Sequence, residues 1–412
     1  VRDLLKSKIY TQYNPVTIAK GIKKETVVQI EENSMKLSGV SVAIEQKRVY
    51  PFGSLASHVL GYVGKIPSSK AEDLIKEGYS PQDMIGLSGI ENSYENKLKG
   101  KDGYKEVKVD SVGRVISQMK SVDPTSGKSV YLTIDSKVQK TAEESLKNAI
   151  ESARSGGTFK SQFGDINIKE SAPKAKSGAI VAIDVTSGDV LAMASYPNYD
   201  PNKFANGISS EDYNNYLPKN LNDMLAPNPL LNLATQGVFQ PGSTFKMVTA
   251  MAALESGLDP SYTIKDPGVI RLGNRNFADY IWHHGGKNHG MVNLYKAIQE
   301  SCNIYFYVLG SNRNWMTGQS LNLGMNANKI LEYAKKFGLD SDTGLEGQLE
   351  ERNGRVPSEE QKIENTKVQL KYALERTMRT HFEGIDYEEN RDEFEEKIDK
   401  IVSWIDEDKT PG

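Results

Sequence analysis

The pattern of hydrophobic and polar positions divides the chain into three stretches. In residues 1–127, a helix-forming segment at 18–37 precedes an alternating segment at 40–45, and glycine-containing turns then follow at short intervals. The alternation predicts a strand over residues 40–45. The frequent turns predict a turn-rich α+β domain with little helix.

Residues 128–349 follow a different pattern, in which strands and helices alternate. Residues 130–134 predict a strand, and Asp135 is placed to cap a helix over residues 137–153. After a polar loop at 155–177, the apolar run 178–183 predicts a buried strand, 186–189 a hairpin turn and 190–194 the returning strand. A hairpin preceded by a helix favours an α/β sandwich with a mixed or antiparallel sheet.

The last stretch, residues 350–412, is highly charged and has helical periodicity. Ile398, Ile401, Val402 and Ile405 stand at positions i, i+3, i+4 and i+7 of one helix face. We expect a charged helical insertion or subdomain whose polar face is solvated.

Composition excludes several functional classes. A chain of 412 residues needs more than one hydrophobic core. The formal net charge of −3 gives no global basic field, so nothing argues for a nucleic-acid partner. No apolar run reaches the ~18 residues that a membrane helix needs, and the single cysteine, Cys302, precludes an intrachain disulfide.

The most informative segment is Gln240-Pro-Gly-Ser-Thr-Phe-Lys246. Pro-Gly breaks the chain before a helical run over residues 244–254, which places Ser243 in the first turn and Lys246 one turn further on the same face. Burial of an ammonium lowers its pKa, and a neutral amine beside a hydroxyl is a workable base. The pattern thus predicts Ser243 as nucleophile and Lys246 as base; alone, it also fits a helix-capping serine with a surface lysine.

A second motif, Ser301-Cys302-Asn303, follows a helical stretch at 292–300. In isolation such a segment is a plain turn held by side-chain-to-backbone bonds. Beside a Ser-x-x-Lys pair, the Ser301 hydroxyl can relay protons and the Asn303 amide can hold the substrate backbone. The two motifs together are typical of penicillin-binding proteins and related β-lactamases.

The chain resembles the class B penicillin-binding proteins, and most of all the elongation-type penicillin-binding protein 2 group. The resemblance covers residues 1–345 and is carried, besides the two motifs, by residues 48–51, 56–64, 86–100, 132–135, 182–197 and 289–306. It implies an α+β multidomain chain. Residues 1–127 form a pedestal (dimerisation-type) domain, 128–349 the first part of a penicillin-binding/β-lactamase-like transpeptidase α/β sandwich, and 350–412 the helical insertion.

The resemblance also implies an activity: Ser243 attacks the D-Ala-D-Ala bond of a peptidoglycan stem peptide, and the acyl-enzyme is aminolysed by a neighbouring stem. β-Lactams acylate the same serine, the Ser243 amide is one oxyanion donor, and catalysis needs no cofactor. Family membership further implies an anchor in the cell membrane, work on its extracytoplasmic face, and a membrane glycan polymerase bound through the pedestal.

One departure from the family pattern leaves other functions open. The third motif, Lys-Ser/Thr-Gly, is absent, and the near match Lys409-Thr-Pro-Gly412 lacks a preceding strand pattern. Either the chain stops inside the transpeptidase domain and the motif lies beyond residue 412, or the protein is inactive. We expect the first, because both earlier motifs are intact. The alternatives are a serine β-lactamase or β-lactam sensor, and a non-catalytic scaffold of a cell-wall elongation complex.

A cluster of metal-binding residue types surrounds the second motif. Asp279, one of the adjacent His283 and His284, His289 and Cys302 make a tetrahedral set suited to zinc. Four protein ligands indicate a structural ion that fixes the Ser301 loop rather than one that activates water. Against this, His289-Gly and the motif cysteine occur in the family without metal, so the zinc site is one of two interpretations.

Overall fold

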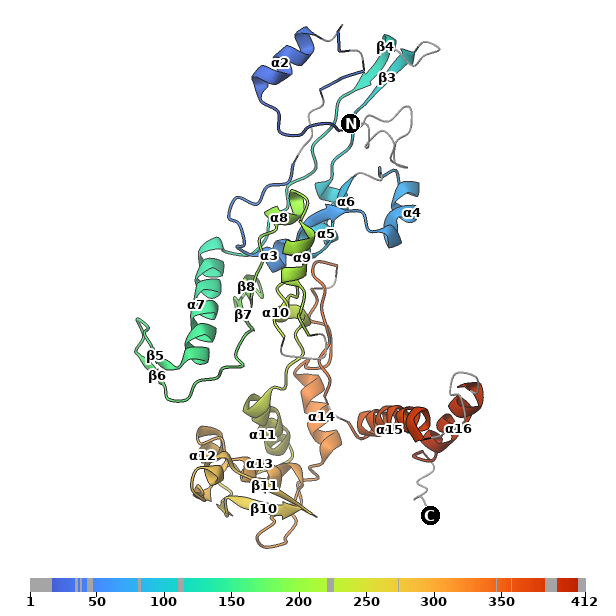
Figure 1. Ribbon diagram of the computed structural model, residues 1–412. Helices are drawn as coiled ribbons and strands as arrows, with labels where there is room; N and C mark the ends of the chain where they lie inside the picture. Colours follow the sequence, from blue (N-terminus) through green and yellow to red (C-terminus); the bar gives the residue numbers. More distant parts are fainter. Residues whose placement is uncertain are drawn as a thin grey trace. The chain divides into compact units, whose positions relative to one another are not determined.

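The computed structural model describes residues 17–33, 36–37, 39–42, 47–80, 83–109, 115–220, 226–272, 274–345, 347–356, 358–381 and 391–406. Residues 43–45 of the predicted strand at 40–45 and the segment 409–412 lie outside these residues, and the described residues 40–42 form no strand. The chain forms two compact units, Val1–Gly237 with Leu345–Glu350, and Val238–Gly344 with Glu351–Gly412 (Figure 1). Within the described part, no helix is both long and apolar enough to cross a membrane.

The first half of unit 1 is built from short elements, as its frequent turns predict. Two antiparallel hairpins, β1 with β2 and β3 with β4, are accompanied by short helices. The elements are α2 (Lys24–Glu32), α3 (Ser57–Leu60), β1 (Val63–Lys65), α4 (Ser68–Lys76), β2 (Met84–Gly86), α5 (Gly89–Ser93), α6 (Glu95–Leu98), β3 (Tyr104–Val109) and β4 (Val115–Val122).

The second half of unit 1 packs a long helix on a hairpin. It contains α7 (Ser136–Ser155), the hairpins β5 (Gly157–Phe159) with β6 (Ile166–Ile168) and β7 (Gly178–Ile183) with β8 (Val190–Tyr196), and then α8 (Asn202–Ala205), α9 (Ser210–Tyr216) and α10 (Leu233–Gln236). Asp135 caps α7 as predicted, and accepts from the amides of Lys137 and Val138. Helix α7 lies beside β8 (Figure 1), and its Leu146 and Ile150 side chains belong to one buried apolar cluster with Ala192 and Ala194 of β8.

Two strand predictions in this region are wrong. Residues 130–134 form no strand; Thr133 Oγ1 donates to the Val190 carbonyl and Asp135 N–H to that of Leu191, but no ladder develops. β7 is not fully buried, because only one face meets α7, and Val181 and Ile183 remain 43% and 55% exposed. An apolar run does not reveal how many faces of a strand are covered.

A buried polar junction joins residues that are distant in the sequence of unit 1. The Tyr199 hydroxyl donates to the Ser57 carbonyl at 2.9 Å, and His58 Nε2 lies 2.8 Å from the Pro229 carbonyl. Gly61 has a left-handed backbone, with φ +78°. The Ser88 backbone packs against it so closely that a Cβ at position 61 would stand 1.8 Å from the Ser88 carbonyl oxygen. The junction thus permits no side chain at position 61.

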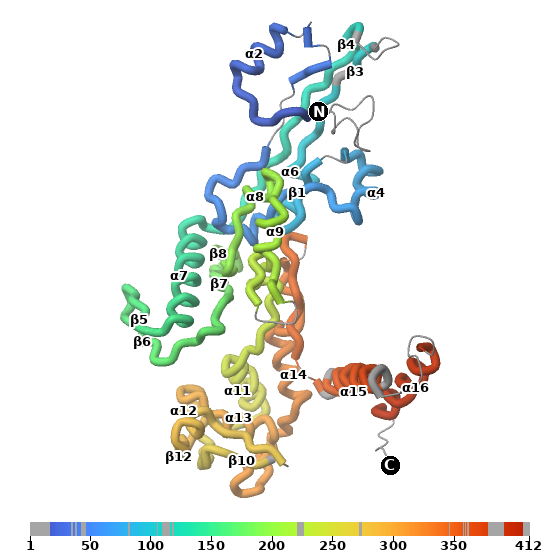
Figure 2. Tube along the Cα trace, in the orientation of Figure 1, coloured from blue at the N-terminus to red at the C-terminus, as the bar shows by residue number. Residues whose placement is uncertain are grey.

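Residues 345–350 return to unit 1 after most of unit 2 has been traced (Figure 2). Gln236 donates to the Glu350 carboxylate at 2.7 Å, Ser93 Oγ donates to the Gln348 carbonyl at 2.8 Å, and Leu349 is buried beside Met193. This short segment therefore packs as part of unit 1, although more than 100 residues of unit 2 separate it from the rest of that unit in the sequence.

Unit 2 is organised around two apolar helices, which carry the two motifs at their starts. Its elements are η1 (Gly242–Phe245), α11 (Lys246–Glu255), β9 (Ile264–Asp266), β10 (Val269–Leu272), β11 (Arg275–Ala278), η2 (Tyr280–His283), β12 (Gly290–Val292), α12 (Leu294–Gln299), α13 (Asn303–Gly310), α14 (Ala327–Lys336), α15 (Glu359–His381) and α16 (Arg391–Ser403). α11 packs on α13 and α14, and Ile304, Tyr305 and Val308 are fully buried between them.

Two antiparallel strand pairs bring the loops of unit 2 together. β10 pairs with β11, and β9 with β12 in a register that sets Asp266 opposite Gly290. This register places the end of β9 beside His289.

The charged segment forms the helical hairpin α15–α16, as its periodicity predicts. Ile398 is fully buried and Phe394 is 7% exposed, while Lys371–Asp399 and Lys367–Asp406 ion pairs of 2.7 and 2.6 Å connect the two helices. Solvent screens both pairs, so they add little to stability. The buried apolar face provides the rest of the packing.

Candidate active site

Ser243 lies in a single 3₁₀ turn immediately before α11. Gly242 has φ +58°, a left-handed conformation in which glycine is favoured, and the turn covers Gly242–Phe245 before the α-helix begins at Lys246. The sequence predicted an α-helix starting at Thr244, so the helix begins two residues later than expected. Ser243 is exposed, and the first-turn amides of a helix have no intrahelical acceptor.

Lys246 contacts the second motif directly. Its Nζ donates to the Ser301 carbonyl at 2.6 Å, to Ser301 Oγ at 3.0 Å and to Asn303 Oδ1 at 2.7 Å. Partial burial lowers the pKa of Lys246, although the nearby Asp279 carboxylate opposes this shift. The pKa of Lys246 is therefore closer to neutral pH than that of a free lysine, so the neutral amine forms more readily.

Ser301 stands between Lys246 and Ser243. Ser301 Oγ lies 2.9 Å from Ser243 Oγ, which completes the hydrogen-bonded chain Lys246–Ser301–Ser243. Lys246 thus reaches Ser243 through the Ser301 hydroxyl. Either hydroxyl can turn, so protons can be passed along the chain in both directions.

The backbone of the second motif is held tightly. Ser301 has φ +54°, the Cys302 amide donates to the Ala297 carbonyl at 2.9 Å, and the Asn303 amide donates to Asp279 Oδ2 at 2.8 Å. The Asn303 side chain is engaged at both ends, since Oδ1 accepts from Lys246 and Nδ2 donates to the Ala278 carbonyl at 3.3 Å. Asn303 therefore positions Lys246.

A pocket of about 360 Å³ opens beside Ser243. It is lined by Ser243, Ser301 and Asn303 of the two motifs, and also by Tyr280, Gln299 and Glu300. No sequence motif marks these last three residues, which are recognised only by their place around the pocket.

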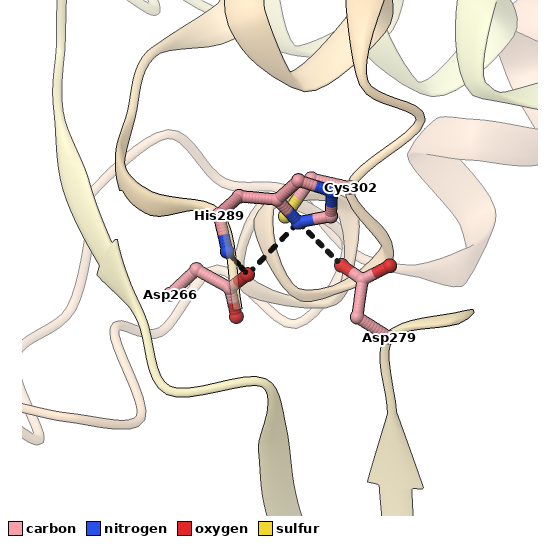
Figure 3. A group of neighbouring side chains, drawn as sticks. All are labelled: Asp266, Asp279, His289 and Cys302. Atoms are coloured by element: carbon pink, nitrogen blue, oxygen red, sulfur yellow. Dashed lines mark hydrogen bonds and ion pairs between the residues drawn. The ribbon is translucent and has the colours of Figure 1, made fainter. Parts of the chain in front are cut away.

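Four buried side chains that suit a metal ion gather next to this pocket. They are Asp266, Asp279, His289 and Cys302, and their ligand atoms lie within 4.8 Å of one another. His289 Nδ1 is 3.0 Å from Asp266 Oδ2 and 3.4 Å from Asp279 Oδ2, and its ring lies between the two carboxylates (Figure 3). Asp266, Asp279 and Cys302 are fully buried.

The cluster differs from the predicted ligand set at one position. His283 and His284 are exposed in and just after the η2 turn and do not join the group, while Asp266 completes it. Asp266 was missed because it is 13 residues from Asp279 and reaches His289 only through the β9–β12 pairing. The only sequence signal for Asp266 as a ligand is that it is an acidic residue at the end of a strand-like segment.

The cluster is joined to the second motif, the segment Ser301-Cys302-Asn303. Asp279 Oδ2 faces His289 and also accepts the amide of Asn303, and Cys302 is the central residue of the second motif. Burial raises the pKa of the Cys302 thiol, with the nearby Asp279 and Asp266 carboxylates adding to the shift, so the thiol is neutral unless a cation stabilises the thiolate.

Comparison with known families and proteins gives consistent matches. The model of the penicillin-binding protein dimerisation domain matches residues 2–132, and that of the penicillin-binding protein transpeptidase domain residues 178–381. Peptidoglycan D,D-transpeptidase MrdA of Acinetobacter baumannii is 32% identical over 89% of this chain and 48% of its own length; the Escherichia coli K12 protein is 34% identical over 85% and 49%. The chain thus spans about half the length of these curated relatives.

Solved structures agree. The complex between penicillin-binding protein PBP2 and MreC from Helicobacter pylori gives a TM-score of 0.63 at 27% identity, covering 89% of this chain and 59% of that one. A peptidoglycan synthase complex gives 0.60 at 30% identity, covering 84% and 54%. The predicted architecture, a pedestal domain followed by a transpeptidase domain, is confirmed.

Proposed function

Because this chain belongs to the penicillin-binding protein family, we propose that it acts as a peptidoglycan D,D-transpeptidase of the elongation-type penicillin-binding protein 2 group. The observation that carries this proposal is the continuous hydrogen-bonded chain Lys246–Ser301–Ser243 beside a pocket. It supplies a nucleophile, a proton path and a base whose pKa is lowered.

Acylation begins when Lys246 is neutral. The Ser243 hydroxyl then donates to Ser301 Oγ, and the Ser301 hydroxyl donates to Lys246 Nζ, which reverses the donation seen when the lysine is charged. As Ser243 Oγ bonds to the carbonyl carbon of the penultimate D-Ala, its proton moves to Lys246 through Ser301. The amide of Ser243, a residue of the turn before α11, would donate to the oxyanion.

The tetrahedral intermediate then breaks its C–N bond. The terminal D-Ala leaves as an amine after taking the proton from Lys246 through Ser301, and an ester to Ser243 remains. The amine of a neighbouring stem attacks this ester, the C–O bond breaks, and one amine proton returns to Ser243 Oγ. One amide replaces another, so no cofactor or energy source is consumed. A β-lactam follows the first half, but its leaving nitrogen stays attached to the opened ring.

Labelled penicillin and a chromogenic cephalosporin test this function in the protein at its full natural length. We expect stoichiometric acylation of Ser243 and a burst without turnover. Loss of labelling in Ser243→Ala, with retention in the exposed neighbour Thr244→Ala, supports Ser243 as nucleophile. Labelling that persists in Ser243→Ala excludes it, whereas steady hydrolysis identifies a β-lactamase.

Family membership supports a location and a partner for the reaction. We propose that it takes place on the extracytoplasmic face of the cell membrane, where stem peptides are cross-linked, with a membrane glycan polymerase bound to the pedestal. Relatives with solved structures are described with MreC and in a peptidoglycan synthase complex. If Ser243→Ala restored growth to a strain depleted of the protein, a scaffold role without catalysis would replace the proposal.

A structural zinc ion at Asp266, Asp279, His289 and Cys302 is part of the proposal. Ligand atoms on a tetrahedral zinc ion stand roughly 3.3–3.7 Å apart, from bond lengths of 2.0–2.3 Å, and the His289–Asp279 distance of 3.4 Å fits this spacing. Within the described residues, neither buried carboxylate has a lysine or arginine ion pair. When bound, the metal would supply charge compensation, and the four side chains would hold the second motif in place.

Metal analysis of protein purified without chelators tests the site. We expect about one equivalent of zinc, its loss in Cys302→Ser and Asp266→Asn, and its retention in His284→Ala, because His284 is exposed outside the cluster. Less than a tenth of an equivalent in the unsubstituted protein excludes the site. Thermal unfolding provides a second readout, since loss of a folding-linked metal lowers Tm.

A further inference from the structure

Two exposed side chains of the pocket, Gln299 and Glu300, take no part in the Lys246–Ser301–Ser243 chain. Glu300 carries a charge, and among the ion pairs of the described residues none includes it. The nearby lysines point elsewhere: Lys246 bonds to Ser301 and Asn303, and Lys296 Nζ donates to the His289 carbonyl at 2.7 Å. The pocket therefore presents a carboxylate without an internal counter-ion beside the nucleophile.

The backbone holds Glu300 in one place. It is the C-cap of α12, with its amide bonded to the Lys296 carbonyl at 2.8 Å, and the next residue is the left-handed Ser301. Cys302 then anchors the turn through its bond to the Ala297 carbonyl. Because Glu300 directly precedes the proton-relaying hydroxyl, a cation bound to it stays within reach of the acyl group.

We propose that Glu300 binds a protonated primary amine of the peptide substrate, an inference that rests on the proposed transpeptidase function. A carboxylate selects an ammonium by a charge-assisted hydrogen bond, and the pocket is open enough to admit one. Two amines share this chemistry: the one on the acceptor stem, held before it loses its proton and attacks, and a side-chain amine on the donor stem. Glu300 forms no covalent bond in either case.

Folding does not depend on this charge. An acid at a helix C-terminus is disfavoured by the helix dipole, so neutral replacement of Glu300 relieves a small penalty. Glu255, the exposed last residue of α11, provides a matched control because it is also an acid at a helix end but does not line the pocket. Glu300→Gln and Glu255→Gln should therefore unfold at or slightly above the Tm of the unsubstituted protein.

The test uses the full natural protein and separates donor from acceptor. The first assay measures acylation by a penicillin that carries no amine. The second measures transfer of the acyl group from a thioester donor to a stem peptide with a free amine, which tests the acceptor. The third compares acylation by stem pentapeptides whose side-chain amine is free or acetylated, which tests the donor. Glu300→Gln should leave penicillin acylation unchanged and Glu255→Gln should change nothing. An acceptor role raises the acceptor KM about tenfold in Glu300→Gln. A donor role instead slows acylation by the free-amine pentapeptide about tenfold and leaves the acetylated one unaffected.

Two outcomes overturn the inference. One is that neither amine-dependent rate changes in Glu300→Gln. The other is that Glu300→Gln leaves the acceptor KM and both pentapeptide acylation rates unchanged but slows hydrolysis of the acyl-enzyme. This result would make Glu300 a general base that activates water instead of an amine-binding residue. If penicillin fails to acylate the unsubstituted protein, the transpeptidase function itself is wrong, and this result does not depend on Glu300.

Discussion

The hydroxyl of Ser301 lies 2.9 Å from the hydroxyl of Ser243, and this contact links the second motif to the first. Lys246, although only three residues from Ser243 in the sequence, bonds to Ser301. Lys246 and Ser243 are therefore connected through a residue 58 positions away from Ser243.

Removal of the Ser301 hydroxyl should slow acylation without unfolding the loop. Ser301→Ala keeps a Cβ at φ +54°, so it isolates the loss of the oxygen from any change in backbone strain. Loss of a proton-transfer group costs ~10²–10⁴-fold in rate. The second-order rate constant for penicillin acylation measures this, and Ser256→Ala, at the C-cap of α11, serves as control. A change smaller than threefold would remove Ser301 from the path.

The acylation rate should rise with pH as Lys246 loses its proton. Since partial burial lowers the pKa of Lys246, the rise should be centred below the ordinary lysine value of ~10.4. The same shift means that the unfolded chain binds more protons between the two pKa values, so Lys246 disfavours the folded state at low pH and stability increases with pH through that window. Acylation profiles of the unsubstituted protein and Lys246→Arg check this, because arginine stays charged and should abolish the activity.

We expect the stability of unit 1 to fall at acidic pH, because the buried His58 side chain becomes protonated. Burial lowers the pKa of His58 to about 4 from an ordinary value of 6.5, against the bond to the Pro229 carbonyl, which favours protonation. The unfolded chain binds the proton first, so roughly 3 kcal/mol of stability is present above pH 6.5 and lost as the pH falls towards 4.

Urea unfolding followed by circular dichroism at pH 7 and 4.5 measures this loss. His58→Gln should show a smaller difference between the two pH values, because it keeps a donor for Pro229 but does not titrate. His284→Gln, at an exposed position, should behave like the unsubstituted protein. Equal pH dependence in the two variants would argue against His58.

The junction of unit 1 should tolerate no side chain at Gly61. Gly61→Ala combines a left-handed residue, φ +78°, with a Cβ only 1.8 Å from the Ser88 carbonyl oxygen, and should destabilise unit 1 by more than ~3 kcal/mol. Gly53→Ala has φ +59° and open space, so it should cost only ~1–2 kcal/mol. The midpoints of urea unfolding compare the two; similar values would mean that backbone conformation, not close contact, sets the cost.

Local features of the chain were predictable from the sequence. Asp135 and the helix after it, the 178–196 hairpin and the Ser301-Cys302-Asn303 turn each depend on residues within a few positions of one another. What could not be predicted depends on pairing over longer distances. Whether residues 130–134 join a sheet, and which faces of β7 are covered, are decided by packing partners elsewhere.

The metal cluster illustrates the same limit. Closeness in sequence suggested His283 and His284 as partners of His289, but the η2 turn leaves both exposed. Asp266 joins through the β9–β12 register instead, and nothing within its own neighbourhood indicates that register. The roles of Ser243 and Lys246 were predicted from their spacing, whereas their connection through Ser301 required the packing of α11 against α13.

The left-handed backbone of Ser301 lowers the stability of the protein at a position whose hydroxyl connects Lys246 with Ser243. A non-glycine residue in this conformation costs ~1 kcal/mol or more, a cost that glycine avoids. Screening variants for heat resistance alone would therefore favour glycine at position 301, and such a variant would survive higher temperature while lacking the hydroxyl between Lys246 and Ser243. At this position, a more durable protein is a less active one.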